Sequence, residues 1–431
     1  MATKRPHTPS SIPTHPSSSS KPTPTPTPPP PPQPPLKQKM ALGFRSLVDG
    51  ARKALTPLSG GTPASQQEPA SARSLFAATD AAVDGEACLH DCDSCHVAYP
   101  RGFKIDEADV LYGHVKGWST HLLVATGKTD WVRDVEDEKG SVMQALGRCP
   151  QKPANGRLML SASNIPVPDS HAHDDAERYA APTTVLLLPA FRLVDNVTPA
   201  AVPTLVSRFI DASPTNASPL APVTLPERIP LSLSPDPTTT SENNGPPPSA
   251  SDLLSRPCPH AALILLCSQK TRDARCGQSA PLLRKELERH LRPLGLFRDL
   301  DDERPGGVGV YFISHVGGHK YSANMMVYRR PDAFGVDDVQ RALHEQQSGG
   351  GDLKPVPQTK RVVEVKPVDA EGGEEEEDSS DVGAGQCIWL ARVKPEDCEN
   401  IIKYTVLQGK VVKPDTQLRG GFDRSKGLMS W

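Results

Sequence analysis

The sequence predicts an α/β protein with a mixed sheet, built as two globular domains joined by low-complexity segments. Apolar runs of strand length recur along the chain, as at 184–188 and 261–267. A helical apolar pattern at 279–294 follows one of these runs, which is typical of an alternating strand and helix order. Segments rich in Pro, Ser and Thr separate the globular regions, so the folded part is smaller than the chain of 431 residues.

Composition excludes several classes of protein. The net charge of −3 argues against a generic nucleic-acid binder, which needs a basic surface. No apolar run approaches the roughly 18 residues of a membrane span. The 9 cysteines are too few and too unevenly placed for a small disulfide scaffold, and they indicate metal or redox thiols in a reducing compartment.

Residues 1–85 are predicted to be a disordered tail rich in Pro, Ser and Thr. Within it, the apolar spacing over 40–55 predicts an amphipathic helix with arginines off its apolar stripe. An acid-poor helix of this kind is typical of a mitochondrial transit peptide. Because a presequence begins at the N-terminus, this interpretation favours Met40 over Met1 as the start. The alternative is a short helix in a disordered tail.

Two domains and a linker are expected after the tail. Residues 86–211 form the first α/β domain, which carries a cysteine cluster and an apolar strand at 184–188. Residues 212–252 are again rich in Pro, Ser and Thr and are predicted to be a linker. Residues 253–431 form the second domain, with a low-complexity acidic insertion at 348–385.

The second domain has the clearer pattern of elements. Strands are predicted at 261–267, 309–313, 324–328 and 388–393, and a helix at 279–294. A further helix is expected to begin at Pro395, where a proline and two acids occupy the first turn.

Two pairs of soft metal ligands follow predicted strands of this domain. Cys267 and Cys276 are separated by eight residues, and His315 and His319 by three. Loops that leave neighbouring strands of an α/β sheet meet at one edge, so the four side chains can close on one centre. A Cys₂His₂ set suits zinc or an iron–sulfur cluster. A [2Fe–2S] cluster needs two ligands on each iron, so the cysteine pair fits one iron and the histidine pair the other. The eight residues between Cys267 and Cys276 are a wider spacing than that of zinc fingers.

These motifs resemble the sucrase/ferredoxin-like family, which are thioredoxin-like [2Fe–2S] ferredoxins with two His in place of two Cys. The resemblance spans both globular regions. It implies that Cys267, Cys276, His315 and His319 are the cluster ligands. The motifs that carry it are Cys267–Gly277, His315–Asn324, Trp389–Arg392, Cys88–Cys95, Gly117–His121, Thr126–Trp131 and Gln417–Phe422.

A second thiol group lies in the first domain. Cys88, Cys92 and Cys95 form a C-x₃-C-x₂-C pattern, for which three interpretations stay open. Cys92 and Cys95 are a thiol–disulfide pair, or the three bind a second metal, or they are free thiols. For the second metal, the candidate fourth ligands are His90, His96 and Cys149. A thioredoxin-type CxxC follows a strand and opens a helix, and neither is predicted here.

The last three residues support a separate hypothesis. Met429–Trp431 is similar to the C-terminal tripeptide through which iron–sulfur clients dock the cytosolic cluster-assembly targeting complex, with Trp431 as the anchor. This hypothesis favours a cytosolic location and opposes the mitochondrial one.

The sequence therefore predicts an electron-transfer or redox-sensing protein with one [2Fe–2S] cluster, acting in mitochondrial redox homeostasis without substrate turnover of its own. It names no redox partner. One alternative is a thiol–disulfide oxidoreductase that uses Cys92 and Cys95. The other is a zinc-stabilised interaction module.

Overall fold

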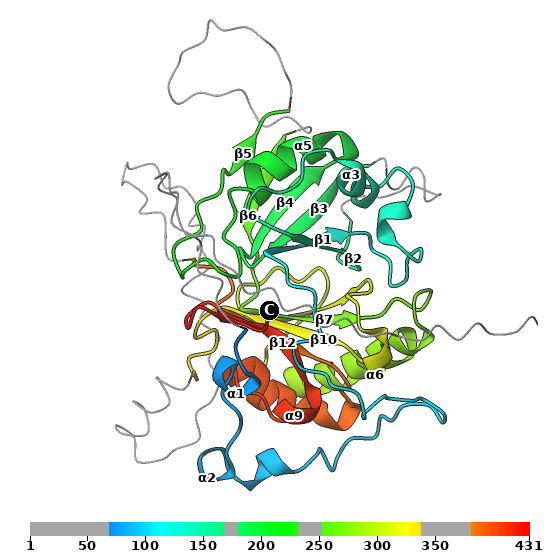
Figure 1. The fold of residues 1–431 in the computed structure, drawn as a ribbon, viewed down its shortest axis with the longest axis vertical. Helices are drawn as coiled ribbons and strands as arrows, with labels where there is room; N and C mark the ends of the chain where they lie inside the picture. The colour runs from blue at the N-terminus through cyan, green and yellow to red at the C-terminus, as the bar shows by residue number, and fades with distance from the viewer. Residues whose placement is uncertain (1–68, 168–178, 180, 232–251, 338–380) are drawn as a thin grey trace, which may run out of the picture. The chain divides into compact units, whose positions relative to one another are not determined.

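The computed structural model describes residues 69–167, 179, 181–231, 252–337 and 381–431 (Figure 1). Its strands form one mixed sheet in the order β13-β12-β11-β10-β7-β9-β2-β1-β3-β4-β6-β5, with β8 paired to β9. The predicted α/β class with a mixed sheet is therefore confirmed. All of these residues fall within one compact unit.

The C-terminal half of the sheet is built around a parallel pair, β7 and β9. Helix α6, which spans Ala274–Leu291, connects the two strands, and β10 and β11 continue the sheet antiparallel beyond β7. This order, β9-β7-β10-β11, is that expected of a thioredoxin-like unit. The strands of this half are β7 (Ala262–Cys267), β8 (Phe297–Arg298), β9 (Val308–Ile313), β10 (Met325–Arg329), β11 (Gln386–Leu390), β12 (Leu418–Asp423) and β13 (Leu428–Met429).

The N-terminal half repeats this topology, which the sequence did not reveal. Strands β1 and β2 are parallel, α3 lies between them in the chain, and β3 and β4 follow antiparallel in the order β2-β1-β3-β4. Figure 1 shows α3 and α5 on this half. Its elements are β1 (Thr120–Ala125), α3 (Val142–Arg148), β2 (Leu158–Ser163), β3 (Thr183–Leu188), β4 (Arg192–Val197), α5 (Val202–Leu205), β5 (Arg228–Ile229) and β6 (Leu253–Pro257).

The helical segments after β4 and β11 are also alike. Each begins with a 3₁₀ turn that contains a proline and ends in a π-helix. Asn196 and Arg392, near the ends of these strands, have the same left-handed backbone, with φ of 62° and 61°. The segments are η3 (Pro199–Ala201), α5 and η4 (Val206–Ile210), and η7 (Pro395–Asp397), α8 (Cys398–Asn400) and η8 (Ile401–Val406). The two halves are therefore structural repeats.

The two halves join at the ends of β2 and β9, where Ser163 pairs with Ile313 in antiparallel orientation. Side chains extend this short contact. Asn164 Oδ1 accepts a hydrogen bond from the Phe312 amide at 2.7 Å, and Ser314 Oγ accepts one from the Ala162 amide at 3.0 Å. Since both strands end here, the loops that follow them lie at the same place.

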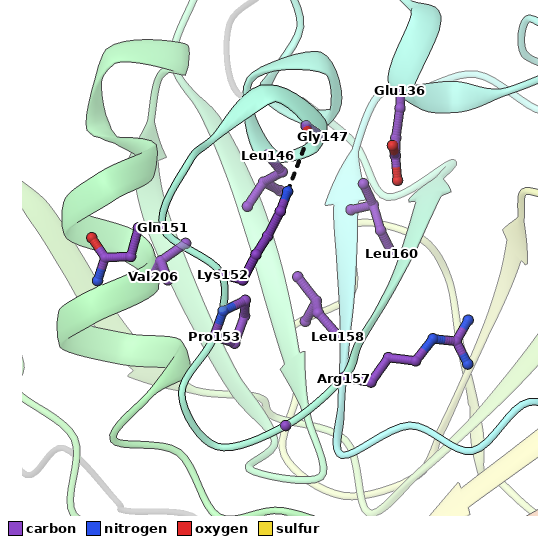
Figure 2. Close-up of a pocket in the computed structure, with 11 residues that line it drawn as sticks. Glu136, Leu146, Gly147, Gln151, Lys152, Pro153, Arg157, Leu158, Leu160 and Val206 are labelled. Carbon is purple, nitrogen blue, oxygen red and sulfur yellow. Dashed lines mark hydrogen bonds between the residues drawn. The ribbon is translucent and has the colours of Figure 1, made fainter.

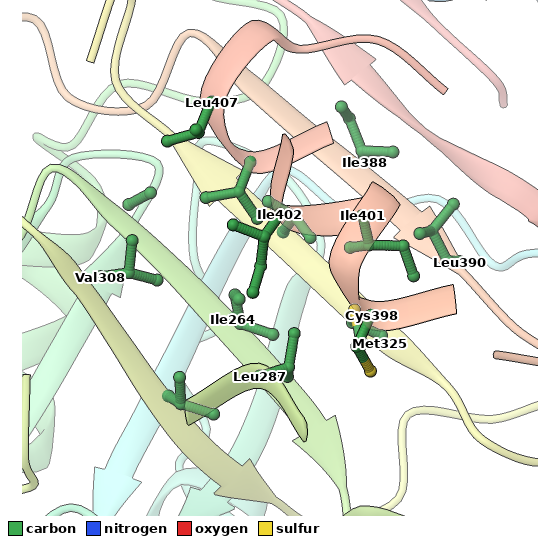
Figure 3. Packing of buried hydrophobic residues seen from close by; sticks show 14 of the residues in the cluster. Ile264, Leu287, Val308, Met325, Ile388, Leu390, Cys398, Ile401, Ile402 and Leu407 are labelled. Atoms are coloured by element: carbon green, nitrogen blue, oxygen red, sulfur yellow. The ribbon is translucent and has the colours of Figure 1, made fainter. Parts of the chain in front are cut away.

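The core of the C-terminal half lies between the sheet and its helices (Figure 3). Leu287 of α6 and Ile401 and Ile402 of η8 pack on the apolar face formed by Ile264 and Met325. These residues are at most 2% exposed. Burying a leucine or isoleucine side chain contributes about 2 kcal/mol, so this face fixes α6 and η8 on the sheet.

Element boundaries differ from prediction where side chains cap or turn the chain. Helix α6 begins at Ala274, five residues before its predicted start, because the Asp273 carboxylate accepts a hydrogen bond from the Arg275 amide and caps it. Strand β11 ends at Leu390, three residues before its predicted end, because Arg392 leaves the extended backbone conformation.

The structure corrects parts of the predicted tail and linker. The residues of the predicted tail that the structure describes begin at Pro69 and include α1 (Ala72–Leu75), where Leu75 and the following Phe76 are at most 2% exposed and pack in the core. Residues 212–231 pack on the sheet, where β5 pairs with β6. Leu75, Phe76 and Leu225 are buried, and Val223, Ile229 and Leu231 pack partly buried against the core, which composition alone does not reveal. The candidate targeting helix at 40–55 lies outside the described residues, as does most of the acidic insertion at 348–385.

Three further short helices cover the C-terminal half. They are α2 (Ala81–Asp84), η1 (Glu86–Leu89) and α9 (Pro414–Gln417). A buried ion pair ties α2 to the segment between η8 and α9, because Lys410 Nζ lies 2.9 Å from Asp84 Oδ1 and both side chains are at most 7% exposed. This pair helps to hold α2 against the C-terminal half.

Candidate metal centre

Three of the predicted ligands meet where two parallel strands end. Cys267 is the last residue of β7, and its register partner on β9 is Ile313. His315 therefore lies two residues beyond the same edge of the sheet. Cys276 lies in the first turn of α6. The convergence expected from the sequence is present for these three side chains.

The donor atoms are close enough to bind one metal centre. Cys267 Sγ lies 3.3 Å from Cys276 Sγ and 3.8 Å from His315 Nδ1, and all three donors lie within 4.8 Å of one another. Two ligands of one tetrahedral zinc ion lie about 3.6 to 3.8 Å apart, given metal–sulfur bonds of about 2.3 Å and metal–nitrogen bonds of about 2.0 Å. The spacing therefore fits a metal with little rearrangement.

The two thiols have very different acidities. Both are at most 1% exposed and neither is in a disulfide. The hydrogen bond with Cys276, opposed by burial and assisted by His315, lowers the pKa of Cys267 to about 5. The pKa of Cys276 is raised, first by that same hydrogen bond and then by burial. One thiolate thus forms readily, and a cation that binds it favours loss of the second proton.

The loop that follows His315 approaches the site closely. Gly317 and Gly318 both have a left-handed backbone, with φ of 83° and 66°. A Cβ at Gly318 would lie 2.4 Å from Arg419 Cζ, so only glycine fits there. His319 begins the turn η5 (His319–Tyr321), and its side chain lies outside what the structure describes. The structure therefore leaves the fourth predicted ligand untested.

Arg419 supports this loop and was not identified from the sequence. Its guanidinium is buried, stacks on the Trp389 ring at 4.1 Å, and donates from Nη1 to the Gly317 carbonyl at 2.9 Å and to Asn324 Oδ1 at 2.9 Å. Burial lowers its pKa to about 10. No carboxylate of the described residues forms an ion pair with it. A buried cation without an acidic partner suits a site that binds negative charge.

Two buried donors beside Cys267 also lack acceptors within the described ranges. They are Arg419 Nε and Asn324 Nδ2. The backbone carbonyl of Asn324 accepts a hydrogen bond from the Cys267 amide at 3.1 Å, so Asn324 adjoins the thiol pair. Unsatisfied buried N–H groups are costly, and thiolate or sulfide is an acceptor that would satisfy them. These donors fit an anionic metal–sulfur centre.

The N-terminal half holds the loop between the two cysteines. Gln269 donates to the Val132 carbonyl at 2.6 Å and accepts from the His315 amide at 2.8 Å, so it joins two loops. Asp130 accepts from the Thr271 amide at 3.0 Å and from its hydroxyl at 2.8 Å. The segment Thr126–Trp131, which carried part of the resemblance, therefore fixes the cysteine loop.

A cleft of about 920 Å³ opens beside His315 and is lined by both halves of the sheet. Arg272 and Lys320, two of its cationic residues, pair with Asp134 at 3.0 Å and with Asp109. The cleft gives solvent and partners access to the imidazole of His315, whereas both thiols lie beneath it.

A smaller pocket of about 270 Å³ lies on the N-terminal half (Figure 2). It is lined mainly by apolar residues such as Leu146, Leu158 and Val206, and Lys152 closes one side by donating to the Gly147 carbonyl at 3.1 Å. Among the described residues that line it there is no Cys or His, so it offers no soft ligand for a metal.

The structure does not gather the other three cysteines into one donor group. Cys88 is buried, whereas Cys92 and Cys95 are half-buried. The donors near Cys92 are His290 and Glu399, which lie within 4.8 Å of it and of each other. Neither His90, His96 nor Cys149 belongs to this group within the described ranges. Cys258, Cys387 and Cys398 are buried.

The C-terminal tripeptide is part of the folded structure. Ser430 is buried, and its Oγ accepts a hydrogen bond from the Gly421 amide at 3.0 Å. Trp431 is half-buried and stacks on Trp118, with ring centroids 4.1 Å apart. Trp118 in turn contacts Trp389, the ring that supports Arg419. A partner that binds Trp431 must first detach it from Trp118.

A search of the described helices finds none with the length and apolar character needed to cross a membrane.

Comparisons with known proteins agree with the resemblance. Actin patches distal protein 1 of Saccharomyces cerevisiae is 28% identical over 267 residues, which are 58% of this chain and 75% of that protein. Altered inheritance of mitochondria protein 32 of Clavispora lusitaniae is 25% identical over 154 residues, or 36% of this chain and 33% of that protein. The same-named protein of Debaryomyces hansenii is 41% identical over 66 residues, 15% of this chain and 20% of that protein.

The matches to the two Altered inheritance of mitochondria proteins therefore cover about a third or less of their length. No solved structure matches the chain. The family model described as "Sucrase/ferredoxin-like" matches residues 111–420, which is more than half of the chain and includes all four predicted ligands. The chain therefore belongs to the sucrase/ferredoxin-like family.

Proposed function

We propose that this chain is an electron-transfer or redox-sensing protein that binds one [2Fe–2S] cluster through Cys267, Cys276, His315 and His319. The observation that carries the proposal is the buried thiol pair at 3.3 Å with the His315 imidazole 3.8 Å away. Membership of a ferredoxin-like family supports a cluster as the bound group. Such a cluster accepts and releases one electron.

The residues of the site have separate tasks in this proposal. Cys267 and Cys276 supply thiolates from a region that water does not reach, and His315 supplies the ligand that borders the cleft. Arg419 and Asn324 offer N–H groups to negative charge and hold the loop at Gly317. A partner in the cleft would thus exchange electrons at the histidine side, which is the exposed side of the site.

We further propose that the protein acts in mitochondrial redox homeostasis. The support is the printed name of two relatives, Altered inheritance of mitochondria protein 32, together with the amphipathic pattern at 40–55. A cytosolic location with cluster delivery through Met429–Trp431 is the alternative. Fractionation of cells that express the full chain, with and without residues 1–55, tests this: loss of a mitochondrial pool on deletion supports import.

The test of the cluster uses the full-length protein purified without oxygen. We expect a red-brown protein with two iron and two acid-labile sulfides per chain and a paramagnetic signal after reduction with dithionite. Cys267→Ser should lose the iron, and His315→Cys should keep it but shift the signal. Two matched controls, Cys149→Ser and His114→Ala, should change neither. A colourless, iron-free protein after reconstitution rejects the proposal.

Zinc is the second candidate, and one distance favours it. Cys267 Sγ and His315 Nδ1 are 3.8 Å apart, which is the spacing of two ligands on one tetrahedral ion. In the cluster proposal these two residues bind different irons and must separate further. Colourless protein that retains one zinc ion per chain, lost in Cys267→Ser, would support this candidate.

A further inference from the structure

A second thiol site lies far from the candidate metal centre, at the opposite end of α6. Cys276 is in the first turn of that helix, whereas Arg289 and His290 are in its last turn. With a rise of 1.5 Å per residue, the 14 residues from Cys276 to His290 span about 21 Å. The side chains around Cys92 are therefore not part of the centre described above.

Cys92 and Cys95 are the two ends of one tight turn. The Cys95 amide donates to the Cys92 carbonyl at 3.2 Å, which closes a β-turn over Asp93 and Ser94. The ends of such a turn have Cα atoms less than about 7 Å apart, and disulfides need about 4.4 to 6.8 Å. Both thiols are free and half-buried, so a disulfide can form between them without moving the backbone far.

Cys92 has a cationic hydrogen-bond donor beside its sulfur. Arg289 Nη2 donates to Cys92 Sγ at 3.3 Å, and the Ser94 hydroxyl is 3.3 Å from the same sulfur. Arg289 is held in place by Glu286, at 2.7 Å. A cationic donor beside a partly exposed sulfur is the environment in which cysteines react as nucleophiles. Cys95 has no such partner among the described residues, and its thiol donates to the Val97 carbonyl at 3.3 Å.

A metal ion is a weaker interpretation of the same cluster. Cys92, His290 and Glu399 are all suitable ligands within 4.8 Å of one another. However, Arg289 Nη2 lies 3.3 Å from Cys92 Sγ and 2.9 Å from His290 Nε2, so a cation already contacts the two best donors. A divalent ion would have to displace this guanidinium against its own charge.

We propose that Cys92 and Cys95 form a reversible dithiol–disulfide site, in which Cys92 is the attacking thiol and Cys95 the resolving thiol. The oxidant is a small disulfide such as glutathione disulfide. The Cys92 thiolate attacks one of its sulfurs, a mixed disulfide forms and one glutathione thiolate leaves. Cys95 then loses its proton and attacks Cys92 Sγ, the second glutathione leaves, and the Cys92–Cys95 disulfide remains. The dithiol has lost two electrons and two protons, which the two released glutathione thiols carry.

The contacts around the turn explain how this exchange leaves the fold intact. The Cys92 amide donates to the Glu396 carbonyl at 3.0 Å, and Asn400 Nδ2 donates to the His90 carbonyl at 2.7 Å. These bonds involve no sulfur and persist in both redox states. The Cys92 sulfur exchanges Arg289 for Cys95, and the Cys95 sulfur gives up its hydrogen bond to the Val97 carbonyl.

The test uses the full-length protein, prepared reduced and exposed to glutathione disulfide. Free and oxidised thiols are counted by differential alkylation and mass spectrometry of the peptide that contains both cysteines. We expect wild-type protein to form the Cys92–Cys95 disulfide. Cys95→Ser should instead accumulate glutathione on Cys92, and Cys92→Ser should form neither product at a comparable rate.

Arginine variants test the role assigned to the cation. Arg289→Gln should slow the modification of Cys92 about tenfold, because a hydrogen bond from a charged donor is lost. Arg284→Gln on the same helix, which pairs with Glu288 at 2.7 Å, is the matched control and should change nothing. Unchanged circular dichroism shows that each variant is folded.

Three outcomes would overturn the proposal. The first is a reduced peptide after prolonged exposure, the second is no trapped glutathione in Cys95→Ser, and the third is zinc that stays bound in wild type and is lost in His290→Ala. The result is independent of the cluster. Cys267→Ser should lose iron yet keep the thiol–disulfide exchange. Cys92→Ser should keep iron and lose the exchange.

Discussion

The packing of Trp431 allows a sharp test of the C-terminal contact. A Cβ added at Gly117 would lie 2.3 Å from Trp431 Cδ1 and 2.7 Å from Cγ, so Gly117→Ala must displace the indole. The backbone of Gly117 is not left-handed, so alanine brings no strain of its own. Gly117→Ala and Trp431→Ala should therefore destabilise the protein through one shared contact.

The expected magnitudes follow from the burial of the ring. Trp431 is half-buried and stacks on Trp118. Burial of about 100 Å² at 25 cal/mol per Å² gives about 2.5 kcal/mol, part of which is the stacking itself. Trp431→Ala should thus lower the free energy of unfolding by about 2–3 kcal/mol. Gly117→Ala should cost about 1–3 kcal/mol through overpacking.

The double variant tests whether Gly117→Ala and Trp431→Ala act through the same contact. Once Trp431 is absent, the added methyl group meets no obstacle, so the double variant should cost no more than Trp431→Ala alone. The coupling free energy should be about 2 kcal/mol, measured by urea unfolding followed by circular dichroism. Gly147→Ala, whose Cβ would meet the flexible Glu136 side chain, is the control and should be additive with Trp431→Ala. Additivity of Gly117→Ala within about 0.5 kcal/mol would refute the packing described here.

The same variants also test the proposed docking of the tripeptide Met429–Trp431. A partner that binds Trp431 must replace a contact of about 2–3 kcal/mol, which corresponds to roughly a hundredfold in affinity. Gly117→Ala releases the ring beforehand and should strengthen such binding. An affinity that does not rise in this variant would count against docking through Trp431.

Three further predictions concern charged groups. His121 is fully buried and burial lowers its pKa to about 3, so only the unfolded state takes up its proton below about pH 6.5; stability should fall by about 1.4 kcal/mol per pH unit towards pH 4, and His121→Gln should flatten that slope in acid unfolding experiments. Arg419→Gln removes the buried cation beside the thiol pair. It should lower the reduction potential of the proposed cluster, measured in a dye-mediated titration, and Arg419→Lys should lower that potential less. Lys410→Met removes the cation paired with the buried Asp84 carboxylate and should cost about 3–5 kcal/mol in urea unfolding, most of which Asp84→Leu in the same chain should restore.

The sequence predicted the part of the site that depends on sheet geometry. Cys267 and His315 each follow an apolar strand, and the ends of parallel strands meet at one edge. The parallel pairing of β7 and β9 made that inference correct. The strands themselves were predictable because each is a short, wholly buried apolar run.

Other parts of the site were beyond prediction, because they depend on contacts between distant segments. Arg419 reaches the loop at Gly317, about a hundred residues earlier, and its position in the chain has no periodic signal. Cys92 meets His290 across 198 residues. A single polar residue on a strand is compatible with an exposed position, so the pattern alone gives no reason to expect a buried guanidinium beside two thiols.

Within the described residues, only one of the two repeats carries the candidate centre. Cys267 ends β7, whereas the equivalent strand β1 ends at Ala125, which has no ligand atom. The corresponding place in the N-terminal half is nearly closed, with a cavity of only about 10 Å³, and Thr126 Oγ1 there accepts a hydrogen bond from Trp131 Nε1 at 2.9 Å.

The loop that begins at Thr126 supports the cysteine loop of the other half. Beyond Thr126 it reaches across to the other half, where the Thr129 carbonyl accepts from Ser268 Oγ at 2.7 Å and the Val132 carbonyl accepts from Gln269. One repeat thus supplies the donor atoms, and the other supplies the wall that holds their loop. Because the wall belongs to a separate repeat, a change such as Asp130→Ala should loosen the cysteine loop and weaken metal retention while both thiols remain in place. That separation also accounts for the cleft at His315, which lies between the two repeats and gives access to the site.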